Sequence, residues 1–344
     1  MNIYKKYSDK GLSGLYNLGN TCYMNTCLQV LSHTYELNNL LDLKKYKTKL
    51  NKNNDSFILL EWDNLRQLMW SENATISPDR FVDYIKKIAK CKGDIKFAGD
   101  DQNDVSEFLI FLIDIFHNAL KREVTMSIQG NVVNDTDDLA MKCYQKIKSM
   151  YSKEYSEIWQ MFYAVQVSQI TSVNTNEIIS TTPEPYFTIN LCVPVNNKSP
   201  DLLECLDLYI EGEKIDGYRN EKTGKTETIT KQVLFWSFPT ILVIDFKRFL
   251  MNERKNQICI HFPLENLDLS KYVIGYNNKS YVYDLYGICN HSGGSSRGGH
   301  YYAYIKNANG RWYNINDTKV SEINESDLIT PKAYCLFYRK KTIL

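Results

Sequence analysis

Residues 14–27 read Gly-Leu-Tyr-Asn-Leu-Gly-Asn-Thr-Cys-Tyr-Met-Asn-Thr-Cys, a turn rich in glycine and asparagine that runs directly into an apolar pattern. Apolar residues then recur at the spacing of one helix face: Met24, Cys27, Leu28 and Leu31. This pattern predicts an amphipathic helix. Cys22 falls in its first turn, and Asn20 or Thr21 is placed to cap the helix.

The position of Cys22 at a helix start favours nucleophilic chemistry. The positive end of the helix dipole stabilises a thiolate, so we expect a lowered pKa for this thiol. Asn17, on the preceding turn, can donate a hydrogen bond to an oxyanion at an attacked carbonyl, with the Cys22 N–H as a second donor. The alternative interpretation of this segment alone is a small buried cysteine, which is what we predict for Cys27.

A second candidate lies in residues 298–317. A glycine stretch enters a predicted strand at His300, and Asn309-Gly310 is a strong turn signal before a returning strand. This hairpin brings Asn316 or Asp317 back beside His300, and an imidazole needs such a partner to fix its tautomer and orientation. The segment therefore supplies a base and its orienting group.

The alternative for His300 is a strand-edge histidine without a role. That interpretation is given to the other histidines: His33, His117, His261 and His291. His291 borders residues 292–299, Ser-Gly-Gly-Ser-Ser-Arg-Gly-Gly, which we predict to be a flexible loop.

The composition indicates a globular protein. The chain has 344 residues, 43 % of them apolar and 24 % charged, with a net charge of +1, so charge alone indicates no nucleic-acid or membrane partner. The first ten residues are polar, without the apolar core of a secretory signal. Nine scattered cysteines form no CxxC pair, which argues against a zinc ribbon and for a reducing compartment. We expect an intracellular protein, cytoplasmic or nuclear, that acts as a monomer.

The pattern of apolar residues changes near residue 163. The first part shows helical periodicity, including residues 105–113 and 139–162, and residues 130–138 are a predicted loop. The second part carries short runs of β-branched and aromatic residues. These runs are residues 165–170, 186–195, 234–249, 281–288, 301–306 and 334–338. A helical front and a β-rich back predict an α+β protein with one catalytic unit.

Both segments resemble the signature boxes of the ubiquitin-specific protease family, the first at residues 14–25 and the second at 298–304 with 312–317. Further stretches match the family in the right order. They are residues 101–109, with Gln102 and Asp104 before Glu107-Phe108, the strand at 184–194, residues 238–249 ending in Lys-Arg-Phe, and His261-Phe262-Pro263. The resemblance covers residues 11–340.

The resemblance implies a papain-like α+β fold shaped as a hand. After an N-terminal extension (residues 1–10), a single catalytic domain (11–344) would comprise a thumb (11–162), fingers (163–240) and a palm (241–344). It also implies hydrolysis of isopeptide or peptide bonds at the C-terminal glycine of ubiquitin. The partners would be ubiquitin and ubiquitinated proteins, with no cofactor.

Residue by residue, the resemblance implies Cys22 as nucleophile, His300 as base and Asn17 as oxyanion donor. Asn316 occupies the third triad position, where many members have Asp, and Asp317 matches a second acidic position that assists it. Asp104 matches an acidic residue that contacts a basic residue of the ubiquitin tail, although a helix-start carboxylate is the simpler interpretation. Gln102, Gly299 and Tyr301 belong to the matched stretches as substrate-binding candidates.

The sequence departs from the family in the fingers. Many members bind zinc there through two CxxC pairs, but here the matching positions are Ser172 to Thr175 and Asn220 with Thr223. We therefore predict no metal, and fingertips that rely on strand pairing. Two other hypotheses stay open: a catalytically inactive ubiquitin-binding scaffold, and an active protease for a ubiquitin-like modifier.

Overall fold

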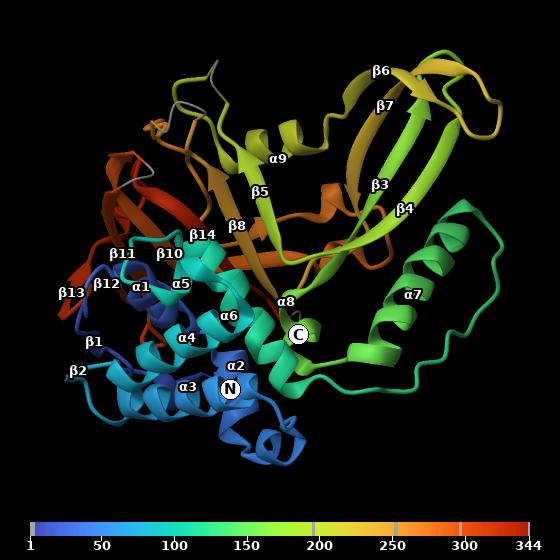
Figure 1. The fold of residues 1–344 in the computed structure, drawn as a ribbon. Coiled ribbons are helices and arrows are strands. Elements are labelled where there is room, and N and C mark those ends of the chain that lie inside the picture. The colour runs from blue at the N-terminus through green and yellow to red at the C-terminus, as the bar shows by residue number, and fades with distance from the viewer. Residues whose placement is uncertain (1–3, 195–196, 251–253, 296–297, 343–344) are drawn as a thin grey trace.

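The structure is a computed structural model that describes residues 4–194, 197–250, 254–295 and 298–342. Its N-terminal half is helical (Figure 1). The helices are α1 (Cys22–Ser32), α2 (Tyr35–Asp42), α3 (Asn54–Ser71), α4 (Asp79–Lys92), α5 (Ile95–Ala98) and α6 (Val105–Leu120), and a short parallel pair joins β1 (Gly14–Leu15) to β2 (Thr75–Ile76). Every residue of α1 is buried, and among the helices it packs on α6 and α2.

A mixed sheet stands against this helical half (Figure 1). Its order is β13 (Lys319–Ile323), β12 (Trp312–Asn316), β11 (Gly298–Lys306), β10 (Val282–Ser295), β14 (Ala333–Lys340), β8 (Ile241–Lys247) and β5 (Thr188–Cys192), with β9 (Leu267–Asp268) paired to β10. Neighbours are antiparallel except β5 and β8. Helix α1 packs on β11 and β10, which brings the cysteine segment and the histidine segment together.

A second sheet projects from the first toward the upper right of Figure 1. Its order is β4 (Ile178–Tyr186), β3 (Ala164–Ser172), β7 (Thr226–Phe235) and β6 (Glu213–Arg219), all antiparallel. Helix α9 (Leu202–Ile210) lies near its base. The predicted α+β class is confirmed.

Residues 139–162 form two helices, not the continuous one that we predicted. Helix α7 (Asp135–Glu154) begins inside the predicted loop, and α8 (Glu157–Phe162) follows a break. The break forms because Ser156 caps α8, its hydroxyl accepting a hydrogen bond from the Trp159 N–H at 3.1 Å. Buried Ala140 and Cys143 then pack α7 on Val165 and Val167 of the second sheet.

The predicted flexible loop at residues 292–299 is largely strand. Strand β10 continues to Ser295 and β11 begins at Gly298. Ser292 pairs with His300, and the register shifts between Ser292 and Ser295. Residues 296 and 297 lie outside the described residues. The strand pair requires glycine at residue 293 because the two backbones approach closely there. A Cβ on Gly293 would lie 2.7 Å from the Gly298 oxygen. Among the described residues, no helix is long and apolar enough to cross a bilayer.

Candidate active site

Cys22 is the first residue of α1 and its side chain is buried, 3 % exposed. The predicted side-chain caps are absent, because both candidates bind elsewhere. The Thr21 hydroxyl accepts from the Leu18 N–H at 2.9 Å, and the Asn20 amide donates to the Asp100 carbonyl at 2.9 Å. The first N–H groups of α1 therefore stay available to the thiol and to anything bound beside it.

The pKa of the Cys22 thiol is raised, not lowered as the helix position predicted. Burial is the largest cause, and the charge of Asp317 acts in the same direction. Hydrogen bonds from the backbone N–H groups of Tyr301, Tyr23 and Cys22 itself favour the thiolate but do not outweigh burial. Desolvation therefore exceeds the effect of the helix start.

His300 lies in β11 and meets the end of β12. Its Nε2 is 2.6 Å from Asn316 Oδ1 and 3.9 Å from Asp317 Oδ2. The hairpin turn that sets this geometry contains Gly310 with φ +86°, a conformation that glycine adopts readily. Among the described residues, no hydrogen bond joins His300 to the Cys22 thiol, but their elements adjoin: α1 packs on β11, and the Tyr301 N–H next to His300 donates to the thiol.

The Asp317 carboxylate ties His300 to the nucleophile segment. Its Oδ1 accepts from the buried Asn25 amide at 2.8 Å, and its Oδ2 accepts from the Asn17 amide at 3.1 Å. The Leu15 N–H also donates to the Asp317 carbonyl, at 2.8 Å. Asp317 adopts φ +49° to make these bonds, a left-handed conformation that is costly for residues other than glycine.

Asn17, the predicted oxyanion donor, is held on the turn before α1. Its Oδ1 accepts from the N–H groups of Gly19 and Thr21 at 3.2 and 3.1 Å, which shapes the turn. Its amide nitrogen points to Asp317 and is exposed. One amide hydrogen therefore serves Asp317 and the second remains for a ligand.

Two of the predicted substrate-binding residues bind each other. The Gln102 amide donates to the Gly299 carbonyl at 3.1 Å, and its Oε1 accepts from the Gly299 N–H at 3.0 Å. Gly299 admits no side chain, because a Cβ there would lie 2.2 Å from His291 Nε2. This pair bridges the cleft between the helical half and the sheet beside His300.

Asp104 is the N-cap of α6. Its Oδ1 accepts from the N–H groups of Ser106 and Glu107 at 2.8 and 3.1 Å. Its Oδ2 accepts from the Tyr334 hydroxyl at 2.5 Å and from the Tyr301 hydroxyl at 3.4 Å. Tyr301, predicted to bind substrate, is buried and directs its hydroxyl to this carboxylate.

A cavity of about 580 Å³ lies beneath the Gln102–Gly299 bridge. Its lining includes Asp104, His291 and Asp245. Burial and the charge of Asp104 raise the pKa of Asp245 to about 8, so this carboxyl carries a proton near neutral pH. Sequence reasoning missed Asp245; the available signal was a carboxylate inside the apolar strand at residues 241–246.

Polar side chains connect the fingertip strands where relatives were expected to bind zinc. The Glu227 carboxylate of β7 accepts from the Ser172 hydroxyl at the end of β3, and from the Asn220 amide at 2.8 Å. We call Ser172, Asn220 and Glu227 the fingertip cluster. In the described parts of the chain, no group of three or more His, Cys, Asp or Glu side chains is arranged to hold a metal ion.

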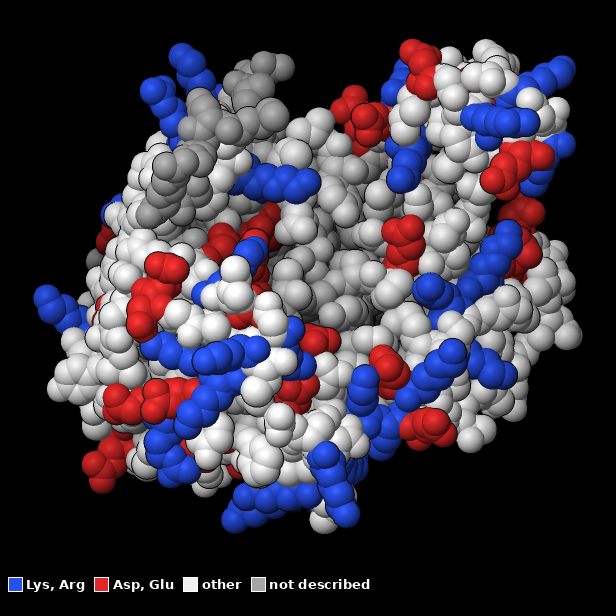
Figure 2. All heavy atoms as spheres, viewed as in Figure 1, with Lys and Arg blue, Asp and Glu red and all other residues white. Residues whose placement is uncertain are grey.

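Charge is mixed over the face that holds the cleft. Figure 2 shows Lys, Arg, Asp and Glu interspersed around a hollow between the helical half and the second sheet. No large field of one sign is visible on this face, so recognition there depends on shape and local pairs.

Residues 13–338 match the family model described as ubiquitin carboxyl-terminal hydrolase. Ubiquitin carboxyl-terminal hydrolase 2 of Homo sapiens is 34 % identical over 350 residues, covering 96 % of this chain and 55 % of the relative. Ubiquitin carboxyl-terminal hydrolase Usp2 of Drosophila melanogaster is 34 % identical over 341 residues, covering 96 % of this chain and 35 % of the relative. The chain thus spans about half the length, or less, of these curated relatives.

The fold also matches solved structures. The SAGA Ubp8/Sgf11/Sus1/Sgf73 DUB module bound to ubiquitin aldehyde aligns with a TM-score of 0.74 at 24 % identity, over 98 % of this chain and 71 % of the other. At this identity the likeness establishes the shared fold.

Proposed function

The chain belongs to the ubiquitin carboxyl-terminal hydrolase family, and we propose that it is a deubiquitinase, a cysteine hydrolase that cleaves isopeptide or peptide bonds at the C-terminal glycine of ubiquitin. The observation that carries the proposal is the convergence of Cys22, at the start of α1, with the His300–Asn316 pair on the adjoining β11–β12 hairpin. A buried thiol, a histidine and an orienting amide in one cleft are the parts that acyl transfer requires.

In the first half of the proposed reaction, His300 takes the Cys22 proton and the thiolate attacks the carbonyl of the terminal glycine. A C–S bond forms, and the oxyanion accepts hydrogen bonds from the Cys22 N–H and the free hydrogen of the Asn17 amide. As the C–N bond breaks, His300 returns its proton to the leaving amine.

In the second half, His300 takes a proton from water, whose oxygen attacks the thioester. A C–O bond forms, the C–S bond breaks, and the thiolate is regenerated. Asn316 Oδ1 holds Nε2 of the ring throughout, which leaves Nδ1 for the proton transfers. We assign Asp317 a supporting role because it holds Asn17 and Asn25 in place.

The proposed substrate segment is an extended Gly-Gly tail in the cleft between thumb and palm. For it to enter, Gln102 and Gly299 release each other and offer the same polar groups to the tail backbone. Asp104 and Tyr301 line the cavity beside that path. A basic residue of the tail would pair with the Asp104 carboxylate in place of its longest hydrogen bond, the one from the Tyr301 hydroxyl at 3.4 Å. The fingers would hold the globular body of ubiquitin, with thumb, fingers and palm divided near residues 162 and 240, in a protein acting as a monomer.

The test is reaction with ubiquitin carrying a C-terminal electrophile, comparing the wild type with Cys22→Ala and with electrophiles of ubiquitin-like modifiers. A covalent adduct on ubiquitin, lost in Cys22→Ala, supports the proposal. An adduct on another modifier instead would assign a different substrate.

One observation favours a second candidate, an inactive ubiquitin-binding scaffold: the thiol has a raised pKa and makes no hydrogen bond to His300 within the described residues. Ubiquitin binding without any covalent adduct would support the inactive scaffold.

A further inference from the structure

Residues 4–17, which we call the strap, follow the β11–β12 hairpin from its turn to its catalytic end. At the turn, the buried Asn307 side chain accepts from the Asp9 N–H at 3.0 Å and donates to the Lys10 carbonyl at 2.8 Å. The Asn309 amide donates to the Asp9 carboxylate at 2.8 Å. Three hydrogen bonds therefore fasten the strap to the turn between the strand of His300 and the strand of Asn316.

The strap meets the same hairpin again at its other end. The Leu15 N–H donates to the Asp317 carbonyl at 2.8 Å. Gly14 lies against the backbone of Thr318 so closely that a Cβ there would be 2.5 Å from the Thr318 oxygen. The chain then passes through the Asn17 turn into α1 and Cys22, so the strap is continuous with the nucleophile.

The path between these ends is fixed. Asp9 and Gly11 both have positive φ, +61° and +72°, and the Gly11 backbone touches the Trp70 ring, where a Cβ would be 2.7 Å away. Asn73 brackets this bend: its amide donates to the Asp9 carbonyl and its Oδ1 accepts from the Leu12 N–H, both at 3.0 Å. Because the strap is restrained at these points, we expect a shift at its outer end to shift its other end as well.

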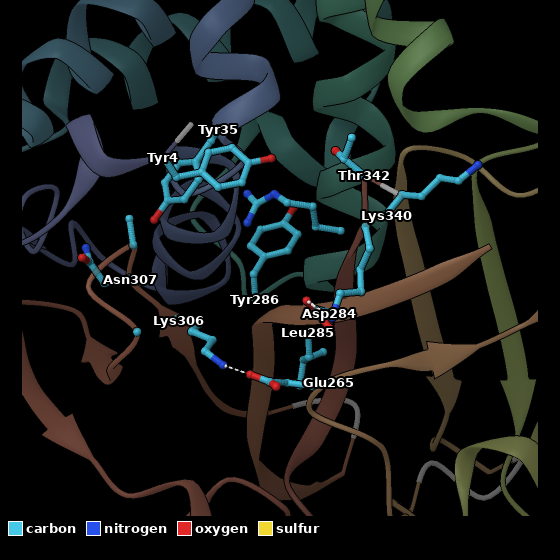
Figure 3. A pocket seen from close by; sticks show the side chains of 14 residues that line it. Tyr4, Tyr35, Glu265, Asp284, Leu285, Tyr286, Lys306, Asn307, Lys340 and Thr342 are labelled. Carbon is cyan, nitrogen blue, oxygen red and sulfur yellow. Dashed lines mark hydrogen bonds and ion pairs between the residues drawn. The ribbon is translucent and has the colours of Figure 1, made fainter. Parts of the chain in front are cut away.

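The outer end of the strap is anchored on buried aromatic residues. The Tyr4 ring lies 4.9 Å from the Arg339 guanidinium, and Tyr7 stacks on Tyr35 at 4.4 Å. A pocket of about 510 Å³ lies beside this anchor, and Figure 3 shows Tyr4 and Asn307 among the residues that line it. The strap, through Tyr4, and the hairpin turn, through Asn307, therefore line the same pocket.

We propose that the strap positions the catalytic hairpin against α1, and that Asn307 is the positioning residue that sets this alignment. The inference rests on the proposed function. It adds a segment that aligns the catalytic residues without being one of them, and most of this segment precedes the family match at residues 13–338. His300 and Cys22 belong to different halves of the fold and share no hydrogen bond among the described residues. Helix α1 also packs directly on β11, and the strap would act beside this contact by fixing the turn and the end of the hairpin. Misplacement by about 1 Å can cost a factor of about 100 in rate.

The experiment compares full-length wild type with Asn307→Ala, using the ubiquitin electrophile and a fluorogenic ubiquitin substrate well below both unfolding temperatures. We expect kcat and the maximal adduct rate to fall about 10- to 100-fold, with KM nearly unchanged, because alignment and not binding is lost. Asn309→Ala, which removes a single strap bond at the surface, should show a smaller loss in the same direction and serves if Asn307→Ala fails to fold.

Asn53→Ala is the matched control. Asn53 caps α3 by accepting from the Ser56 N–H at 3.0 Å, so this variant should lower the unfolding temperature and keep its kcat. If both turn variants keep wild-type kcat, or if only KM changes, the strap has no positioning role. If the wild type itself forms no adduct, the proposed function fails instead.

Discussion

Gln102 and Gly299 are joined across the cleft by two hydrogen bonds, one in each direction, at 3.1 and 3.0 Å. Gly299 immediately precedes His300, and Gln102 also lies 3.4 Å from the Asn20 amide beside the nucleophile turn. The bridge uses the backbone N–H and C=O of Gly299, the groups that an extended peptide would pair with. The two residues therefore satisfy each other's polar groups, and in the proposed function a substrate tail would replace these hydrogen bonds.

Breaking this bridge should expose the nucleophile. In Gln102→Ala we expect alkylation of Cys22 by a small haloacetamide to become several-fold faster, because each lost bond contributes about 1 kcal/mol. The modified Cys22 peptide, quantified by mass spectrometry, separates this thiol from exposed Cys91 and Cys192. Gln67→Ala, which removes an α3 amide bonded to Asp63, is the control. An unchanged rate would mean that the bridge does not cover the thiol.

The orienting role can be assigned between Asn316 and Asp317. Asn316 is 2.6 Å from His300 Nε2, whereas Asp317 is 3.9 Å away, so Asn316→Ala should lower kcat by roughly 10- to 100-fold at constant KM. Asp317→Asn preserves the shape of the side chain and should cost less. The opposite ranking in steady-state kinetics would identify Asp317 as the group that holds the ring.

Local sequence patterns predicted the parts of the site well. The helix after Thr21 and the hairpin around Asn309-Gly310 follow from periodicity and turn chemistry, and the structure has both. Residues 292–299 were misjudged because composition alone cannot indicate that two glycine-rich segments pair with each other. Their strand pairing depends on β10 and β11 lying side by side, a tertiary contact that overrides local preference.

Long-range contacts account for what the sequence did not predict. The pKa of Cys22 is raised by burial under β11, and the pKa of Asp245 is raised by burial and by the charge of Asp104, which is far away in sequence. The residues expected to bind a substrate, Gln102 and Gly299, are 197 positions apart and bind each other. None of these partners is visible within a window of neighbouring residues.

The fingertip cluster should support substrate affinity without metal. Glu227→Ala removes the acceptor shared by Ser172 and Asn220. The end of β3 and the start of β7 then lose the hydrogen bond that joins their side chains. We expect KM for ubiquitin substrates to rise a few-fold with kcat unchanged, because the cluster is far from the reacting atoms. Glu221→Ala, an exposed change in the adjoining turn, is the control. A metal chelator should change neither enzyme; inhibition by the chelator would refute a metal-free fingertip.

Acid should destabilise the fold between about pH 6.5 and pH 4. Burial lowers the pKa of His33, His117 and His291 to about 4 from 6.5, so the unfolded chain binds protons that the folded chain does not. Stability therefore falls as pH falls through this window, by about 2 kcal/mol per histidine from pH 7 to pH 5. Asp245 and Asp114, whose pKa values are raised by burial, oppose the trend of the three histidines.

Thermal unfolding of wild type and His117→Phe at pH 7 and pH 5 measures this effect. The phenyl ring retains the stack on Trp159 at 4.1 Å but cannot bind a proton, so the variant should lose less stability on acidification. An equal loss in both proteins would show that His117 does not contribute to acid sensitivity.

The most demanding prediction concerns Asn17, whose oxygen and nitrogen have separate tasks. Its Oδ1 shapes the turn through Gly19 and Thr21, and its nitrogen donates to Asp317 and is exposed to the cleft. Asn17→Asp keeps an acceptor for the turn, loses the donor and sets a second carboxylate against Asp317, whereas Asn17→Ala loses both donor and acceptor without adding charge. If the amide stabilises the oxyanion, both variants should lose about 10²- to 10³-fold in kcat. Affinity for ubiquitin aldehyde, whose adduct with the thiol places an oxygen at the same position, should fall in parallel. A near-normal Asn17→Asp enzyme would leave oxyanion stabilisation to the Cys22 N–H and reduce Asn17 to a residue that shapes the turn.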